Sequence, residues 1–273
     1  MEVYWLEQAE ADVPSNTDWL VANETVNLNG LRFAKRRADW LLGRWTAKRA
    51  VAAFLNMPDH AAALASIEIR TTPCGAPKVF LANQPAAVTI SLSHRAGIAS
   101  CAIAMHGVTI GCDLEMIEPH SDAFVADYFT TEEQLLVAQA SGEERWPILA
   151  LLWSAKESAL KALRSGLRLD TRCVIVTPTN TPGHRVENAN KCIQGSALDS
   201  WQSYGLSSWS PLQVRYIAGQ VFQGWWQQTG DLVRTVVATP PPFQPIALSI
   251  PAYRPMSASG FAEAKNYLTA KTR

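Results

Sequence analysis

Two long stretches of the chain repeat apolar residues at the spacing of an amphipathic helix. The first covers residues 32–57, with Leu41, Trp45 and Leu55 among its apolar positions, and the sequence "MPDH" ends the pattern. The second covers residues 145–166 and stops near a glycine. The helices carry similar sequences, "WTAK" in the first and "WSAK" in the second. We therefore predict two long, related helices.

Alternation with a period of two predicts the strands. A short first strand at "VYWL" and a strand at 66–80 that runs into a Pro/Gly turn flank the first helix. Residues 88–105 resemble a hairpin connected by "SHRAG", and residues 107–117 form the next strand. Later strands are predicted at "TRCVIVT", "LQVRYIAGQV" and "LVRTVVAT". The segment 178–211 is predicted to be loop, and the chain from residue 239 onward to be a tail with little pattern.

Each half of the chain thus combines one long helix with about three strands. We predict an α+β fold of two similar halves, 1–106 and 107–273, each a long helix packed on a small antiparallel sheet and related by a pseudo-twofold axis. The alternative is a chance similarity between two alanine-rich helices. The matching strands favour the repeat.

Composition narrows the class of protein. The 273 residues include 24 Lys+Arg and 24 Asp+Glu, and this balance argues against general affinity for nucleic acid or acidic membranes. No apolar stretch is long enough to span a bilayer, and the first residues lack a signal-peptide core. The five cysteines have no C-x-x-C spacing, which favours reduced thiols. We expect a cytoplasmic protein.

The candidate chemistry lies on the strand at 107–117 and the second helix. Asp113 and Glu115 are two residues apart, so both side chains project from one face of the strand, and their oxygens suit Mg²⁺. Glu157 is a candidate third ligand, and Lys161 lies one turn later on the same helix face. The alternatives are a solvated strand edge for Asp113 and Glu115, and a surface ion pair for Glu157 and Lys161.

Several ordered motifs resemble one family. "GCDLE" followed by "WSAKESALK" resembles the G-x-D-x-E and W-x-x-K-E-x-x-x-K motifs of the 4′-phosphopantetheinyl transferases. "RRADWLLGRWTAKRA", "ISLSHRAG" and "YFTTEE" resemble its first helix, its S-H-x-G segment and a later helix start, and the two-halved, Sfp-type class fits best. The resemblance implies Mg²⁺-dependent transfer of the phosphopantetheine arm of coenzyme A to a serine of an apo acyl or peptidyl carrier protein, with release of 3′,5′-ADP.

The resemblance also implies roles for individual residues. Asp113, Glu115 and Glu157 would hold Mg²⁺. The base that takes the serine proton would be Glu157, held by Lys161, or else Glu133, and the motifs do not separate the two. The residues implied in binding coenzyme A are Lys35, Arg36, Arg37, Ser93, His94 and Lys156.

One turn departs from the family pattern. The family often has G-K-P there, with the lysine holding coenzyme A, whereas this chain has Gly75-Ala76-Pro77 followed by Lys78. Either Lys78 replaces that lysine after a small shift, or Arg70 and the helix arginines carry the contact.

The resemblance further implies a monomer with its active site between the halves. A basic or apolar rim around residues 112–128 and the helix start at Glu132 would receive an acidic carrier protein. Two other functions stay open. One is a general Mg²⁺-dependent phosphate transferase, although no G-x-x-x-x-G-K-[ST] loop is present. The other is a non-catalytic homologue that binds coenzyme A or a carrier protein, which the alanine at position 76 would favour.

Overall fold

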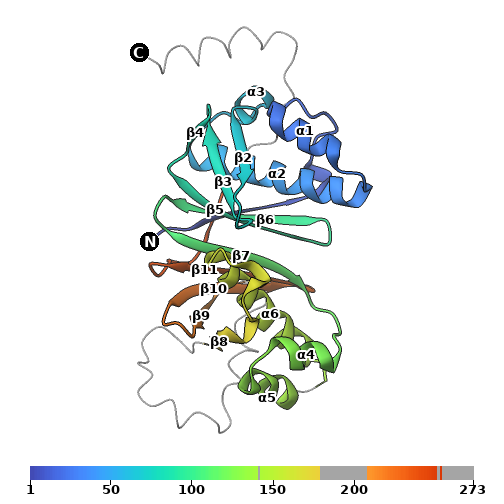
Figure 1. The fold of residues 1–273 in the computed structure, drawn as a ribbon, viewed down its shortest axis with the longest axis vertical. Coiled ribbons are helices and arrows are strands. Elements are labelled where there is room, and N and C mark those ends of the chain that lie inside the picture. The colour runs from blue at the N-terminus through green and yellow to red at the C-terminus, as the bar shows by residue number, and fades with distance from the viewer. Residues whose placement is uncertain (141, 179–207, 251–252, 254–273) are drawn as a thin grey trace.

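The structure, a computed structural model, describes residues 1–140, 142–178, 208–250 and 253, and has a mixed α+β fold (Figure 1). The first half of the chain contains β1 (Tyr4–Ala9), η1 (Glu10–Asp12), α1 (Ala22–Gly30), α2 (Ala34–Phe54), α3 (Ala61–Leu64), β2 (Ile67–Thr71), β3 (Pro77–Leu81), β4 (Gln84–Pro85), β5 (Val88–Arg95) and β6 (Ile98–Met105). The second half contains β7 (Thr109–Met116), α4 (Asp122–Tyr128), α5 (Thr131–Gln139), α6 (Arg145–Ala162), η2 (Gly166–Arg168), η3 (Thr171–Cys173), β8 (Val174–Pro178), β9 (Ser210–Tyr216), β10 (Val221–Thr229), β11 (Leu232–Thr239) and β12 (Ile246–Ala247).

The strands of the described residues form three sheets. One has the order β12-β1-β6-β5, a second has the order β7-β11-β10-β9-β8, and β2, β3 and β4 form a small third sheet. Pairing is antiparallel within the second sheet, where Asp113 of β7 lies opposite Thr235 of β11. The two larger sheets lie between α2 and α6 (Figure 1).

Three apolar clusters hold these layers together. Side chains of α2, including Trp45 and Val51, pack on the first sheet through Ile90 and Ile103. Side chains of α6 pack on the second sheet. Between the two sheets, a smaller cluster joins Ile110 and Cys112 of β7 to Val3, Ala102, Ala104, Val236 and Ala238. The apolar face of β7 therefore joins the halves, and its other face is left for α6.

A glycine sets the distance between β7 and α6. A Cβ atom on Gly111 would lie 1.8 Å from the backbone oxygen of Ser158, so no other residue fits without moving the helix. Because Gly111, Asp113 and Glu115 alternate along the strand, both carboxylates share the face that α6 covers. This close approach brings the chemistry-bearing strand and helix together.

Both long helices are fixed by the same kind of buried ion pair. In the first half, Lys48 Nζ lies 2.6 Å from Glu24, whose side chain also accepts from the backbone N–H groups of Val21 and Ile69. In the second half, Lys156 Nζ lies 2.8 Å from Glu133, whose side chain accepts from Thr130 N and Val176 N. Both lysine side chains are fully buried, and both donate to further backbone carbonyls. Each pair connects a short helix start, a long helix and a strand.

Several predicted elements are confirmed, and others are wrong in part. Both long helices, the strand that carries Asp113 and the capped start of α5 at Thr130 are present. The hairpin connection is shorter than "SHRAG", because β5 continues to Arg95 and Ala96 and Gly97, both at positive φ, make the turn. The stretch 212–221 is not one strand, since β9 ends at Tyr216 and β10 begins at Val221.

The predicted loop at 178–211 lies outside the described residues except at its two ends, and the tail is described only to residue 250 and at 253. That part of the tail returns to the first half. β12 pairs in parallel with β1, Leu248 N donates to Trp5 O, and the ring of Tyr253 lies 4.9 Å from that of Trp45. The division at 106/107 stays a prediction, and residues 246–250 and Tyr253 pack with the first half.

Candidate active site

Asp113 lies at the centre of a polar cluster between β5, β7 and α6. Its Oδ1 accepts from Lys161 Nζ at 2.7 Å and from Ser93 Oγ at 2.8 Å, and Lys161 also donates to Cys112 O. The side chain is 5% exposed, and its Oδ2 has no hydrogen-bond partner among the described residues. A buried carboxylate oxygen without a partner is costly and favours a cation beside it.

Two further carboxylates surround Asp113. Burial and the negative charges of Asp113 and Glu157 raise the pKa of Glu115 to about 7, although Arg95, whose Nε lies 3.6 Å from Glu115 Oε2, opposes the shift. Burial and Asp113 also raise the pKa of Glu157, with Lys161 opposing. The pKa of Lys161 is raised because its acidic neighbours, Asp113 foremost, outweigh the effect of burial. The cluster therefore has more negative charge than its cations balance.

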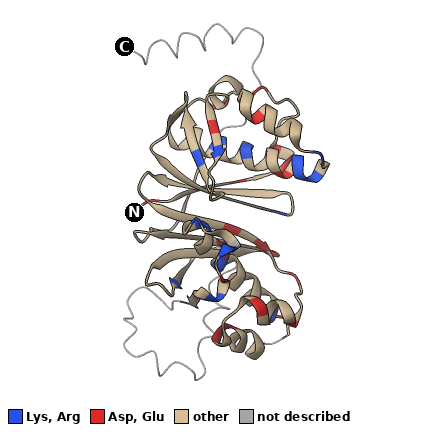
Figure 2. Ribbon diagram, viewed as in Figure 1, with Lys and Arg blue, Asp and Glu red and all other residues tan. Residues whose placement is uncertain are grey.

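The donor set fits a hard divalent cation in its chemistry. Carboxylate oxygens on β7 and α6 are the ligands that Mg²⁺ prefers, and the unpartnered Oδ2 of Asp113 is available. Among the described residues, no group of three His, Cys, Asp or Glu side chains is arranged to hold a metal ion. Figure 2 shows acidic positions on β7 beside basic positions on α6. The three-ligand set is a proposal and is taken up below.

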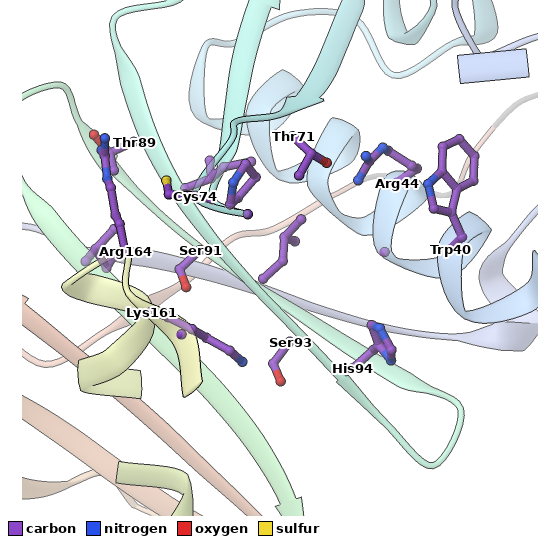
Figure 3. Close-up of a pocket in the computed structure, with 18 of the residues that line it drawn as sticks. Trp40, Arg44, Thr71, Cys74, Thr89, Ser91, Ser93, His94, Lys161 and Arg164 are labelled. Carbon is purple, nitrogen blue, oxygen red and sulfur yellow. The ribbon is translucent and has the colours of Figure 1, made fainter. Parts of the chain in front are cut away.

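A cavity of about 380 Å³ opens beside this cluster. Its walls come from α2, the turn between β2 and β3, β5, the start of β7 and the end of α6. Lys161 and Ser93, which both bond to Asp113, line the cavity, and Figure 3 shows Lys161 pointing toward Ser93. A ligand in this cavity would therefore lie directly against the side chains that hold Asp113.

The predicted coenzyme A residues fall into two groups. Gly75, Ser93 and His94 line the cavity. Lys35 and Arg36 are exposed at the start of α2, and Arg37 donates to Leu28 O at 2.6 Å; none of these three is among the lining residues.

The two candidates for the missing turn lysine also lie off the cavity wall. Arg70 Nη2 bonds to Glu68 at 2.5 Å and to Asn83 at 2.6 Å, with its guanidinium over the ring of Phe80. Lys78 is exposed, with Nζ 5.5 Å from the same ring. Neither residue is among those that line the cavity.

Glu133 and Lys156 form the buried pair described above and do not reach the cluster around Asp113. Glu133 is 3% exposed, Lys156 is fully buried, and all their polar contacts go to each other and to the backbone. In this arrangement Glu133 has no path to a substrate hydroxyl and Lys156 has none to a phosphate. We leave both out of the proposed site.

The lining residues that are absent from the predicted set include Trp40, Arg44 and Arg164. The Arg44 guanidinium lies over the Trp40 ring at 4.9 Å. Burial lowers the pKa of Arg44, although the negative charge of Glu24 opposes this shift. Arg164 follows the end of α6 and lies on the cavity wall opposite Trp40 and Arg44 (Figure 3). The helical spacing of residues 40 and 44, and of 157, 161 and 164, would have indicated that these side chains share a face.

Comparison with known proteins gives one family. The family model described as the 4′-phosphopantetheinyl transferase superfamily matches residues 109–214, a segment that begins with β7 and includes α6. Comparison with curated proteins gives no match. The matched segment includes the carboxylate cluster, and this segment is similar to that superfamily. No helix in the described residues has the length and apolar character needed to cross a membrane.

Proposed function

We propose that the protein transfers the 4′-phosphopantetheine arm of coenzyme A to a serine of an apo acyl or peptidyl carrier protein. The observation that carries this proposal is the buried, under-neutralised carboxylate cluster around Asp113, which lies within the segment matched by the family. The two side chains that bond to Asp113, Lys161 and Ser93, line the neighbouring cavity. The pyrophosphate of coenzyme A would lie against the carboxylate cluster, and its nucleotide would lie in the cavity.

Asp113, Glu115 and Glu157 would hold Mg²⁺. When bound, the ion would neutralise charge on the pyrophosphate of coenzyme A. The protein groups would position the reactants: Lys161 and Ser93 hold Asp113 in place through its Oδ1, which leaves Oδ2 free. Burial, and after it the negative charge of Asp113, raise the pKa of Glu115 and of Glu157, and a bound cation would offset both effects.

In the proposed reaction, the serine oxygen of the carrier forms a bond to the β-phosphorus of coenzyme A. The bond from that phosphorus to the bridging oxygen breaks, and 3′,5′-ADP leaves with the electron pair. Glu157 takes the serine proton, because Glu133 is held inside the second half and Glu157 lies beside the cluster. Lys161, four residues after Glu157, is a positioning residue for Asp113.

The finer parts of the assignment belong to the same proposal. We infer a two-halved, Sfp-type monomer, with halves 1–106 and 107–273 related by a pseudo-twofold axis. The matched ion pairs Lys48–Glu24 and Lys156–Glu133 support the repeat. Cavity walls that come from both halves support a complete site within one chain.

The test is the intact mass of an apo acyl carrier protein and of an apo peptidyl carrier protein, each incubated with the protein, coenzyme A and Mg²⁺. We expect a gain of one phosphopantetheine arm on at least one carrier, lost with EDTA and with Asp113→Asn. Calorimetry with coenzyme A runs in parallel. Binding of coenzyme A without transfer to either carrier would replace the proposal with the non-catalytic homologue.

A further inference from the structure

The two long helices end in the same backbone motif but with different residues. After α2, Asn56 N donates to Ala53 O and Met57 N to Ala52 O; after α6, Arg164 N donates to Lys161 O and Ser165 N to Leu160 O. Asn56 and Arg164 have φ values of 53° and 56°, so both occupy the left-handed position of this motif. Gly and Asn adopt that conformation readily, whereas Arg adopts it with strain. The strained choice lies in the half that carries the carboxylates, which points to a role for the side chain.

The Arg164 side chain lies on the cavity wall. It extends from the end of α6 toward Thr89 and the β2–β3 turn (Figure 3). Hydrogen bonds with Thr72 and Ala76 lower the pKa of the Cys74 thiol in that turn, and the charge of Arg164 makes a smaller contribution in the same direction. Among the described residues, Arg164 has no carboxylate partner, whereas the other lining cations do: Lys161 is paired with Asp113, and Arg44 lies 3.8 Å from Glu24.

The adjoining turn lacks a cation of its own at the cavity. Cys74, Gly75, Ala76 and Pro77 line the wall without a positive charge, and the nearby Lys78 and Arg70 lie off the cavity. Arg164 is therefore the lining cation without a carboxylate partner among the described residues, and it faces the turn from the opposite half of the chain. Arg168, from the same half, donates to Cys74 O of the turn at 2.9 Å but does not line the cavity.

We propose that Arg164 binds a phosphate of coenzyme A and so replaces, from α6, the cation that the Gly75-Ala76-Pro77 turn does not supply. The inference rests on the proposed function, since it takes coenzyme A as the cavity's ligand. A guanidinium group suits it, because it can donate two parallel hydrogen bonds to phosphate oxygens.

The experiment measures coenzyme A affinity by titration calorimetry for wild type, Arg164→Gly and the matched variant Asn56→Gly. Glycine suits both positions, so neither variant should lose stability in a thermal melt. We expect Arg164→Gly to raise the Kd for coenzyme A by roughly tenfold to a hundredfold, the worth of a hydrogen-bonded charge contact, and Asn56→Gly to leave it unchanged. We expect the difference between Arg164→Gly and wild type to shrink at about 0.5 M KCl, because salt screens an exposed ion pair.

Equal affinity of wild type and Arg164→Gly would overturn the inference, and so would a loss of affinity that does not depend on salt, since that would indicate an altered cavity shape. Failure of the wild type itself to bind coenzyme A would overturn the proposed function instead. The two failures are therefore distinguishable in one set of titrations.

Discussion

The two halves hold their long helices alike and use them differently. Lys48 and Lys156 are both fully buried and paired with a glutamate that also caps a short helix, and burial lowers the pKa of each despite that partner. One residue later the halves diverge. Arg49 of α2 is paired with Asp59, whereas Glu157 of α6 lies by Asp113. The buried lysines hold the helices in place in both halves, and we propose that the residues that differ carry the chemistry.

The largest expected effect is a loss of transfer activity on substitution of Glu157, which Arg49 at the corresponding place in α2 should not show. Glu157→Gln should lower phosphopantetheine transfer by about a thousandfold or more, because it removes the proposed base and one proposed metal ligand while keeping the side chain's shape. Transfer is measured by the mass gain of the carrier protein over time.

Arg49→Gln is the matched change in the first half. It breaks the pair with Asp59 and should lower stability, but the folded variant should transfer at the wild-type rate. Loss of transfer by a folded Arg49→Gln, or its retention in Glu157→Gln, would contradict this division of roles.

The next prediction concerns the stability that the buried lysine–glutamate pair contributes in each half. Lys156→Met leaves the buried Glu133 without its cation, so it should lower the free energy of unfolding by about 3–5 kcal/mol. Lys48→Met leaves Glu24 with Arg44 at 3.8 Å, so its loss should lie at the lower end of that range. Urea unfolding measures this loss. Adding Glu133→Gln to Lys156→Met and Glu24→Gln to Lys48→Met should recover part of it, since the unpaired charge is removed.

The same pair of variants resolves the role of Lys156. The folded fraction of Lys156→Met should bind coenzyme A as tightly as wild type, because the ammonium is buried against Glu133 and the backbone. A weakening seen with Lys156→Met and not with Lys48→Met would instead place Lys156 in contact with a phosphate.

A smaller expected effect is the pH dependence of stability that Glu115 causes in the second half. The pKa of Glu115 is raised from 4.5 to about 7, so the folded state holds a proton that the unfolded state has released. Metal-free wild type should therefore lose stability as pH rises from about 4.5 through about 7, by roughly 1–3 kcal/mol, and Glu115→Gln should not show this loss.

Thermal melts of both proteins at pH 5 and pH 8 measure the effect. Mg²⁺ should restore the stability of wild type at pH 8 and have less effect on Glu115→Gln. The exposed Glu143→Gln is the control and should follow wild type throughout. Equal pH dependence in wild type and Glu115→Gln would show that Glu115 is not a strained member of the cluster.

Local pattern predicted much of the fold. The period of the apolar residues gave both long helices and the β5–β6 hairpin, and alternation along β7 placed Asp113 and Glu115 on one face. It could not place β12 beside β1, because that pairing joins residues at opposite ends of the chain. The helices α1, α3 and α4 were also missed; all are short, with nine, four and seven residues.

Sequence spacing predicts which side chains of the candidate site lie on a common face, but it does not predict their partners. Asp113, Glu115, Glu157 and Lys161 follow from periods of two and four, and three of these side chains surround that of Asp113. Spacing does not reveal burial, so Lys156 and Glu133 looked like candidates although each is the other's partner. The similar sequences "WTAK" and "WSAK" held the missing signal, because Lys48 of the first forms the same kind of buried pair with Glu24 as Lys156 of the second forms with Glu133.

The return of the chain to β1 bears on the order of folding. Tyr4 pairs with Ile246, so this parallel contact closes a loop that contains nearly every other element of the described structure. The entropic cost of closing so long a loop falls once the intervening strands and helices have packed, because packing shortens the flexible part of the loop. The second half must therefore be largely formed before β12 docks. The docking of β12 and Tyr253 on the first half should be the last step by which the chain reaches its native state.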